Sequence, residues 1–183
     1  MKNINFGKDI VFDEVNHRYI NPIKNIAYLS VTGLIGRKNK FDSLNIAKKI
    51  SVNENSRYFG MTVDQILQKW DNVSTEGTYL HNSIETFIDK KRLLEEFPED
   101  IFPAIYEFSK IKMRGKLHSE IRVWNHEYEL AGTLDISEER DDCYIIHDIK
   151  TNRKVDYSTL KKFSIQVNLY RWMFEDLLKT IGD

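Results

Sequence analysis

The sequence predicts a mixed α/β (α+β) fold in a single domain covering residues 1–183. Short β-prone runs lie near the N-terminus, a strong helical period follows from about residue 62, and three strand-like runs lie between residues 117 and 150. The 183 residues, of which 41% are apolar, are enough to bury one sizeable core and few for two domains.

The N-terminal region is expected to form a small β-hairpin or meander within residues 1–30. Its β-prone runs are residues 10–12, 17–20 and 26–29. Two short helices are expected next. The first begins at Ser30 or Thr32 and reaches Gly36, and the second begins at Asp42 or Ser43 and reaches about Ile50.

A long amphipathic helix is predicted from Thr62 to about Asp89. Thr62 followed by Gln65 has the form of a capping box. Apolar or small residues then recur at alternating steps of four and three, namely Ile66, Trp70, Val73, Gly77, Leu80, Ile84 and Phe87. Glycine is unfavourable inside a helix, so Gly77 indicates that another backbone or a ligand comes close there. A polar stripe runs beside the apolar one and comprises Ser74, Thr78, His81 and Glu85.

The second half of the chain is predicted to form a helix, three strands and a final helix. The helix runs from Pro98 to about Met113, and the strands span residues 117–124, 127–136 and 143–150. The final helix spans about 158–178. The polar residues 137–142 indicate the loop of an antiparallel hairpin, which could bring Asp135 beside Asp148.

Composition excludes several classes of protein. No apolar run approaches the roughly 18 residues that span a bilayer, and the N-terminus lacks the apolar centre of a signal peptide, so we expect a cytoplasmic protein without a membrane partner. A lone cysteine, Cys143, rules out an internal disulfide, a Cys-rich zinc site and a four-cysteine iron–sulfur cluster. The net charge of −1 does not by itself indicate nucleic-acid binding.

Six side chains are candidates for a metal-dependent catalytic site: His81, Glu85, Glu120, Asp135, Asp148 and Lys150. Carboxylates with one imidazole suit Mg²⁺ or Mn²⁺, as one or two ions. A lysine at the edge of such a site can orient a water, act as its base or stabilise charge on phosphorus, so the set predicts a phosphodiester hydrolase. Taken singly, each residue is more often a surface ion pair or a solvated strand position, and the prediction depends on the combination.

These residues stand in an ordered set of motifs that resembles a known family. The motifs are Gly77-Thr-Tyr-Leu-His81-Asn-Ser-Ile-Glu85, Glu120, Gly132-Thr-Leu-Asp135, Asp148-Ile-Lys150-Thr151 and Gln166-Val-Asn-Leu-Tyr170. Together they resemble the RecB-like branch of the PD-(D/E)XK nuclease superfamily. Small phage recombination exonucleases look nearest, because His17-Arg-Tyr19 and Ser30-Val-Thr32 match segments that often begin them.

The resemblance implies a restriction-endonuclease-like core, with a central mixed β-sheet flanked by helices, an N-terminal β-hairpin and a catalytic core at residues 62–170. The catalytic residues it implies are Asp135, Asp148, Lys150 and Glu85. The metal ligands would be His81, Asp135, Asp148 and the backbone carbonyl of Ile149, with Glu120 as a further candidate. Contacts with DNA would come from Thr78, Thr151, Gln166 and Tyr170.

The expected function is a Mg²⁺- or Mn²⁺-dependent deoxyribonuclease, an exonuclease acting on DNA ends or single strands in recombination or repair, in a bacterium or phage-infected cell. A single-strand-annealing or recombination protein is the expected partner. The alternatives are an endonuclease that cuts branched or specific duplex DNA, and a catalytically inactive DNA-binding protein on the same fold. The family usually adds a core strand after the Gln166–Tyr170 helix, so the strand is missing, the N-terminal hairpin completes the sheet, or the chain is a truncated form.

Overall fold

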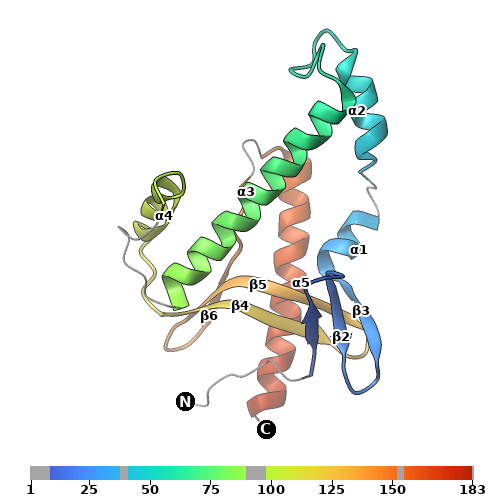
Figure 1. Cartoon of the computed structure of the whole chain (residues 1–183). Coiled ribbons are helices and arrows are strands. Elements are labelled where there is room, and N and C mark those ends of the chain that lie inside the picture. Colours follow the sequence, from blue (N-terminus) through green and yellow to red (C-terminus); the bar gives the residue numbers. More distant parts are fainter. Residues whose placement is uncertain (1–8, 38–40, 90–97, 152–154, 183) are drawn as a thin grey trace.

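The computed structural model describes residues 9–37, 41–89, 98–151 and 155–182. Within these residues the chain is a mixed α/β structure with a six-stranded sheet and five helices (Figure 1). The elements in chain order are β1 (Val11–Asp13), β2 (Arg18–Asn21), β3 (Ile26–Ser30), α1 (Val31–Arg37), α2 (Ser43–Ser51), α3 (Val63–Asp89), α4 (Phe102–Ser109), β4 (Lys116–Asn125), β5 (Leu130–Glu139), β6 (Tyr144–His147) and α5 (Tyr157–Gly182).

Strand β5 is the centre of the sheet. The predicted N-terminal meander is confirmed as β1, β2 and β3, which pair antiparallel, and β3 joins the start of β5 in parallel through Leu29 and Ser30. Strand β4 covers one whole edge of β5, while β6 pairs antiparallel with the last residues of β5 on the other edge. Strands β3 and β6 therefore pair with the two ends of β5, and residues 132–135 lie between these two pairings. This is the point where the sheet forks.

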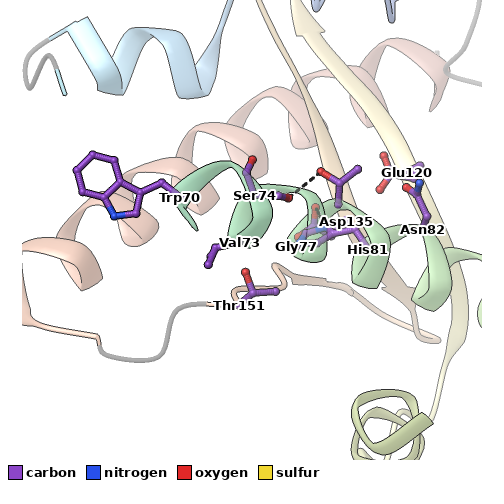
Figure 2. A pocket seen from close by; sticks show the side chains of 10 residues that line it. Trp70, Val73, Ser74, Gly77, His81, Asn82, Glu120, Asp135 and Thr151 are labelled. Atoms are coloured by element: carbon purple, nitrogen blue, oxygen red, sulfur yellow. Dashed lines mark hydrogen bonds and ion pairs between the residues drawn. The ribbon is translucent and has the colours of Figure 1, made fainter. Parts of the chain in front are cut away.

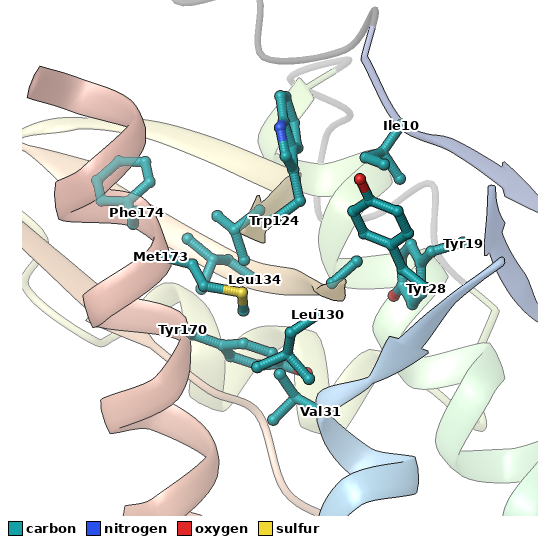
Figure 3. Packing of buried hydrophobic residues seen from close by; sticks show 12 residues of the cluster. Ile10, Tyr19, Tyr28, Val31, Trp124, Leu130, Leu134, Tyr170, Met173 and Phe174 are labelled. Atoms are coloured by element: carbon teal, nitrogen blue, oxygen red, sulfur yellow. The ribbon is translucent and has the colours of Figure 1, made fainter. Parts of the chain in front are cut away.

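Helix α5 packs on the sheet through the larger of two apolar clusters. Tyr170, Met173 and Phe174 are buried there against strand residues such as Leu134 (Figure 3). A side chain at Gly132 would overlap the Tyr170 ring, so glycine at this position lets the helix approach the strand closely. The second cluster joins the end of α3 to α4 and the sheet, and its buried members are Ile84, Ile101, Ile105 and Ile136.

Helix α3 runs the full length that its periodicity predicts. Both bonds of the capping box are present: the Thr62 N–H donates to Gln65 Oε1 at 2.9 Å, and the Gln65 N–H donates to Thr62 Oγ1 at 3.2 Å. The helix contacts α2 near its start and the sheet near its end, and residues 71–76 between these contacts are exposed. Helix α2 and the start of α3 project away from the sheet (Figure 1).

Three predicted boundaries are wrong. The helix expected from Pro98 to Met113 is only α4, because a turn in which the Pro98 carbonyl accepts the Phe102 N–H precedes it. The polar residues 137–139, expected in a loop, extend β5. The strand expected to reach Lys150 stops at His147, since the Ile149 N–H bonds to a side chain on β5.

Among the described residues, no helix combines the length and apolar character needed to cross a membrane. The two longest, α3 and α5, both carry charged residues throughout their length.

Candidate metal and catalytic site

Three side chains from three different elements meet where the sheet forks. His81 comes from α3, Glu120 from β4 and Asp135 from β5, and one possible ligand atom of each lies within 4.8 Å of the others. His81 Nδ1 is 3.5 Å from Asp135 Oδ1. An imidazole and two carboxylates at this spacing form a donor set that fits a hard divalent cation.

The register of β4 and β5 explains why Glu120 and Asp135 meet. Ser119 pairs with Ile136 and Ile121 pairs with Leu134, so Glu120 stands opposite Asp135. The ladder is interrupted there, because Glu120 has a φ of 49°, in the left-handed region that a residue with a side chain rarely adopts. Such local strain inside a strand is typical of functional sites.

The acids of this cluster are crowded. The pKa of Glu120 is raised from 4.5 to about 7, first because its carboxyl is partly withdrawn from water and then because Asp135 and Glu85 are close. The pKa of His81 is also raised, chiefly by its hydrogen bond to Asp135. Neighbouring acids contribute to both shifts, and a bound cation would offset their negative charge.

Beside this cluster, Asp148 and Lys150 form an ion pair. Lys150 Nζ lies 2.6 Å from Asp148 Oδ2, and Gln166 Nε2 donates to Asp148 Oδ1 at 3.2 Å. Burial raises the pKa of Asp148 even though Lys150 opposes the shift. Gln166 Nε2 also lies within hydrogen-bond distance of the Tyr170 hydroxyl, at 3.3 Å. The aspartate is thus fixed between a cation and an amide.

A hydrogen bond from a backbone N–H joins the three-residue cluster to the Asp148–Lys150 ion pair. The Ile149 N–H donates to Asp135 Oδ2 at 2.6 Å, while Asp135 Oδ1 faces His81. The residue between Asp148 and Lys150 is therefore fastened to the carboxylate of the donor set. Asp148, predicted as a ligand, lies outside the three-residue cluster, although Asp135 is close enough to affect its pKa.

The cluster opens into a cleft of about 570 Å³ between α3 and the strands (Figure 2). Its lining residues are Trp70, Val73, Ser74, Gly77, Thr78, His81, Asn82, Glu120, Asp135 and Thr151. A Cβ atom at Gly77 would lie 3.2 Å from Thr151 Oγ1, so glycine keeps the helix close to the segment after β6. This close approach agrees with the prediction made for Gly77.

The remaining predicted residues are placed around the cleft. Thr78 and Thr151 line it. Glu85 is half-buried, close enough to Glu120 to raise its pKa. Gln166 and Tyr170 lie behind the ion pair, where Tyr170 is only 5% exposed. Neither Glu85 nor the Ile149 carbonyl belongs to the three-residue cluster. Their roles at a metal site therefore stay predictions.

Three residues that line the cleft were not predicted there, namely Trp70, Val73 and Asn82. Trp70 belongs to the apolar stripe of α3, which predicted only core packing, yet it forms part of the cleft wall. Asn82 follows His81 directly and has no distinguishing pattern. The signal that could have found Trp70 is its residue type, because tryptophan carries a polar N–H and is rarely buried completely.

Comparisons with known proteins do not identify the chain. It matches no protein-family model, no curated protein and no solved structure. Its function must therefore be argued from the residues of the cleft and their geometry.

Proposed function

We propose that the chain is a Mg²⁺- or Mn²⁺-dependent deoxyribonuclease, an exonuclease acting on DNA ends or single strands in recombination or repair. We further propose a restriction-endonuclease-like core of the RecB-like branch of the PD-(D/E)XK superfamily. The observation that supports this best is the donor set His81, Glu120 and Asp135 beside the Asp148–Lys150 pair, joined by the Ile149 N–H.

The donor set fits the proposed metal. His81, Glu120 and Asp135 would hold the ion, and its charge would remove the repulsion that raises the pKa of Glu120. A bound divalent ion supplies neutralisation of phosphate charge and a lowered pKa for bound water. Asp148, the remaining carboxylate of the predicted ligand set, is close enough to Asp135 and His81 for their charges to affect its pKa.

Lys150 is the proposed catalytic amine. Its side chain is 26% exposed, and its Nζ is held 2.6 Å from Asp148, so the ammonium is oriented and still accessible to a substrate. An ammonium at this place can donate to a phosphate oxygen as negative charge develops, or orient an attacking water. Gln166 and Asp148 position it, because the amide fixes the aspartate that pairs with the lysine.

The cleft suits a nucleic-acid strand. Between Trp70 and His81 its α3 wall consists of Val73, Ser74, Gly77 and Thr78, which bear no charge. The Thr151 hydroxyl can donate to a phosphate or sugar oxygen, and the Thr78 hydroxyl, which donates to the Ser74 carbonyl at 3.2 Å, can accept from a donor group of the strand. The acids are confined to the inner end, so a strand could lie along the wall without repelling its phosphates over the whole length.

The proposal is tested by incubating the protein with end-labelled linear DNA and with circular DNA in the presence of Mg²⁺ or Mn²⁺. Wild type is expected to degrade the linear DNA, and Lys150→Ala to reduce the rate at least about 100-fold. Lys110→Ala is the matched control, since Lys110 also forms a 2.7 Å ion pair, with Glu107 on α4. It should cleave like wild type.

Each result has a defined meaning. Cleavage of linear but not circular DNA supports an exonuclease, whereas cleavage of the circle replaces it with an endonuclease. DNA binding without any cleavage indicates an inactive DNA-binding protein. Equal cleavage by Lys150→Ala and wild type contradicts the proposed mechanism.

A further inference from the structure

Trp70 stands at the end of the cleft that lies away from the donor set. Trp70 and His81 both line the cleft and are eleven residues apart on α3, which corresponds to about 16 Å along the helix axis (Figure 2). The helix between them is exposed, and Val73 at 51% exposure presents an apolar surface beside Trp70. A continuous wall therefore connects the indole to the acids.

The indole is held by two other aromatic residues. The Phe41 and Trp70 rings have centroids 5.3 Å apart, and Tyr58 meets Trp70 edge to face at 6.1 Å. Trp70 Nε1 donates to the Tyr58 hydroxyl at 3.1 Å, which satisfies the only polar group of the indole. What the indole offers to the cleft is therefore apolar ring surface. Phe41, which packs on the indole, is 67% exposed and does not itself line the cleft.

Two cations lie beside Tyr58 of this aromatic group. The Arg57 guanidinium lies 4.7 Å from the centre of the Tyr58 ring, and Lys69 is close enough to act on the same tyrosine electrostatically. Lys48 and Lys49 lie in the last turn of α2, which contacts α3. The acids Asp71 and Glu76 on this part of α3 do not line the cleft. Partly exposed aromatic rings with cations beside them suit a polyanion with flat apolar groups.

We propose that Trp70, supported by Phe41 and Tyr58, is a stacking site for an unpaired base of a single-stranded nucleic acid. The strand would continue along Val73 and Thr78 to the donor set. This inference rests on the proposed nuclease function and adds a binding subsite to it. An unpaired base is required, because the bases of a duplex are stacked on one another and cannot cover the indole. The 16 Å separation corresponds to roughly five stacked nucleotides, and to fewer in an extended strand.

The test measures binding of a fluorescein-labelled single strand of about 15 deoxyadenylates by fluorescence anisotropy. Ca²⁺ replaces Mg²⁺, and the readout is binding, so a protein that fails to cleave DNA can still support or contradict the stacking site. Trp70→Ala is expected to weaken binding about tenfold, and Trp70→Phe, which keeps a ring, to weaken it much less. Trp172→Ala is the control, because Trp172 is a 39% exposed tryptophan on α5 outside the cleft.

A second measurement leaves the protein unchanged. A series of the same strands, each with one abasic position, is bound to wild type, and one position or two neighbouring positions should cost most of the affinity. The stacking site is refuted if affinity falls equally at all positions, or if the folded Trp70→Ala protein binds as tightly as Trp172→Ala. Preference for a blunt duplex over the single strand would also contradict it.

Discussion

Strand β5 carries two carboxylates three residues apart, Asp135 and Glu138, and their surroundings are opposite in charge balance. Glu138 is fully buried, and its oxygens accept the backbone N–H groups of Arg114 and Gly115 at 2.7 and 2.8 Å. Arg140 adds two donors at 2.9 and 3.2 Å, and His147 Nε2 lies 3.1 Å away. The pKa of Glu138 falls to about 2, chiefly because of Arg140.

The cluster around Asp135 has the reverse balance. Its partners are one imidazole, one backbone N–H and a second carboxylate, that of Glu120. There the pKa of Glu120 rises to about 7, since burial and neighbouring acids outweigh His81. Groups of the protein thus neutralise the charge of the buried Glu138. The cluster around Asp135 has fewer positively charged partners than it has acids. This contrast separates a structural carboxylate from the cluster for which a metal ion is proposed.

The first prediction concerns Glu138, whose charge is neutralised by Arg140 and His147. Glu138→Gln removes the negative charge that Arg140 and His147 share, and it replaces one buried acceptor oxygen by an NH2 group that faces these donors, so the melting temperature should fall by several degrees or more. DNA cleavage per folded molecule should be kept. Thermal melts by circular dichroism measure the change, and Glu107→Gln, at an exposed ion pair on α4, is the control. Equal melting temperatures for the two variants would contradict a structural role for Glu138.

The second prediction compares the two sites by pH without metal. The folded protein holds a proton on Glu120 between about pH 4.5 and 7, so this group lowers stability as the pH rises through that range. His81 acts in the same direction, because the stability from its raised pKa is present below 6.5 and is lost above it. Glu138 acts oppositely, since its depressed pKa gives stability above 4.5 that is lost toward pH 2.

Urea denaturation in EDTA measures this dependence. The free energy of unfolding of wild type should decline between about pH 4.5 and 7, and Glu120→Gln should decline less. Mn²⁺ should reverse the decline, because the ion binds the deprotonated groups. A free energy that rises throughout this range equally in wild type and Glu120→Gln would show that Glu120 is not crowded.

The third prediction has the smallest expected effect. It concerns the packing of Gly132 against Tyr170, beside the cluster around Asp135. Gly132→Ala would push a methyl group into the Tyr170 ring, which should lower the free energy of unfolding by about 1–3 kcal/mol. Cleavage should also fall, because Tyr170 holds Gln166 and Gln166 holds Asp148. Gly36→Ala, where an added Cβ meets nothing within 4 Å, should raise stability by up to about 1 kcal/mol. Similar unfolding energies for both variants would refute the packing argument.

The long regular elements could be predicted from the sequence. A capping box and seven apolar or small positions defined α3, and both capping bonds are found. Strand ends were less certain, because the alternating pattern of residues 143–150 does not show that Ile149 bonds to Asp135 instead of a neighbouring strand. Glu138 was assigned to a loop, since its burial depends on N–H groups more than twenty residues away.

The sequence predicted which residues form the candidate site, but not which of them lie together in the three-residue cluster. His81 and Asp135 meet as expected, and Asp148 contacts Lys150. The sequence could not show that Glu120, an open alternative, is the third member of the cluster in place of Asp148. Glu120 joins the cluster from a left-handed backbone conformation, which sequence pattern does not encode for a glutamate.

The most direct test of the difference between the two acids is titration of Mn²⁺ by isothermal calorimetry at about pH 8. Wild type and a folded Glu138→Gln protein should bind the ion with similar affinity, while Asp135→Asn, which keeps an acceptor for the Ile149 N–H, should bind at least tenfold more weakly. If Asp135→Asn binds Mn²⁺ as tightly as wild type, the cluster on β5 is not a metal site.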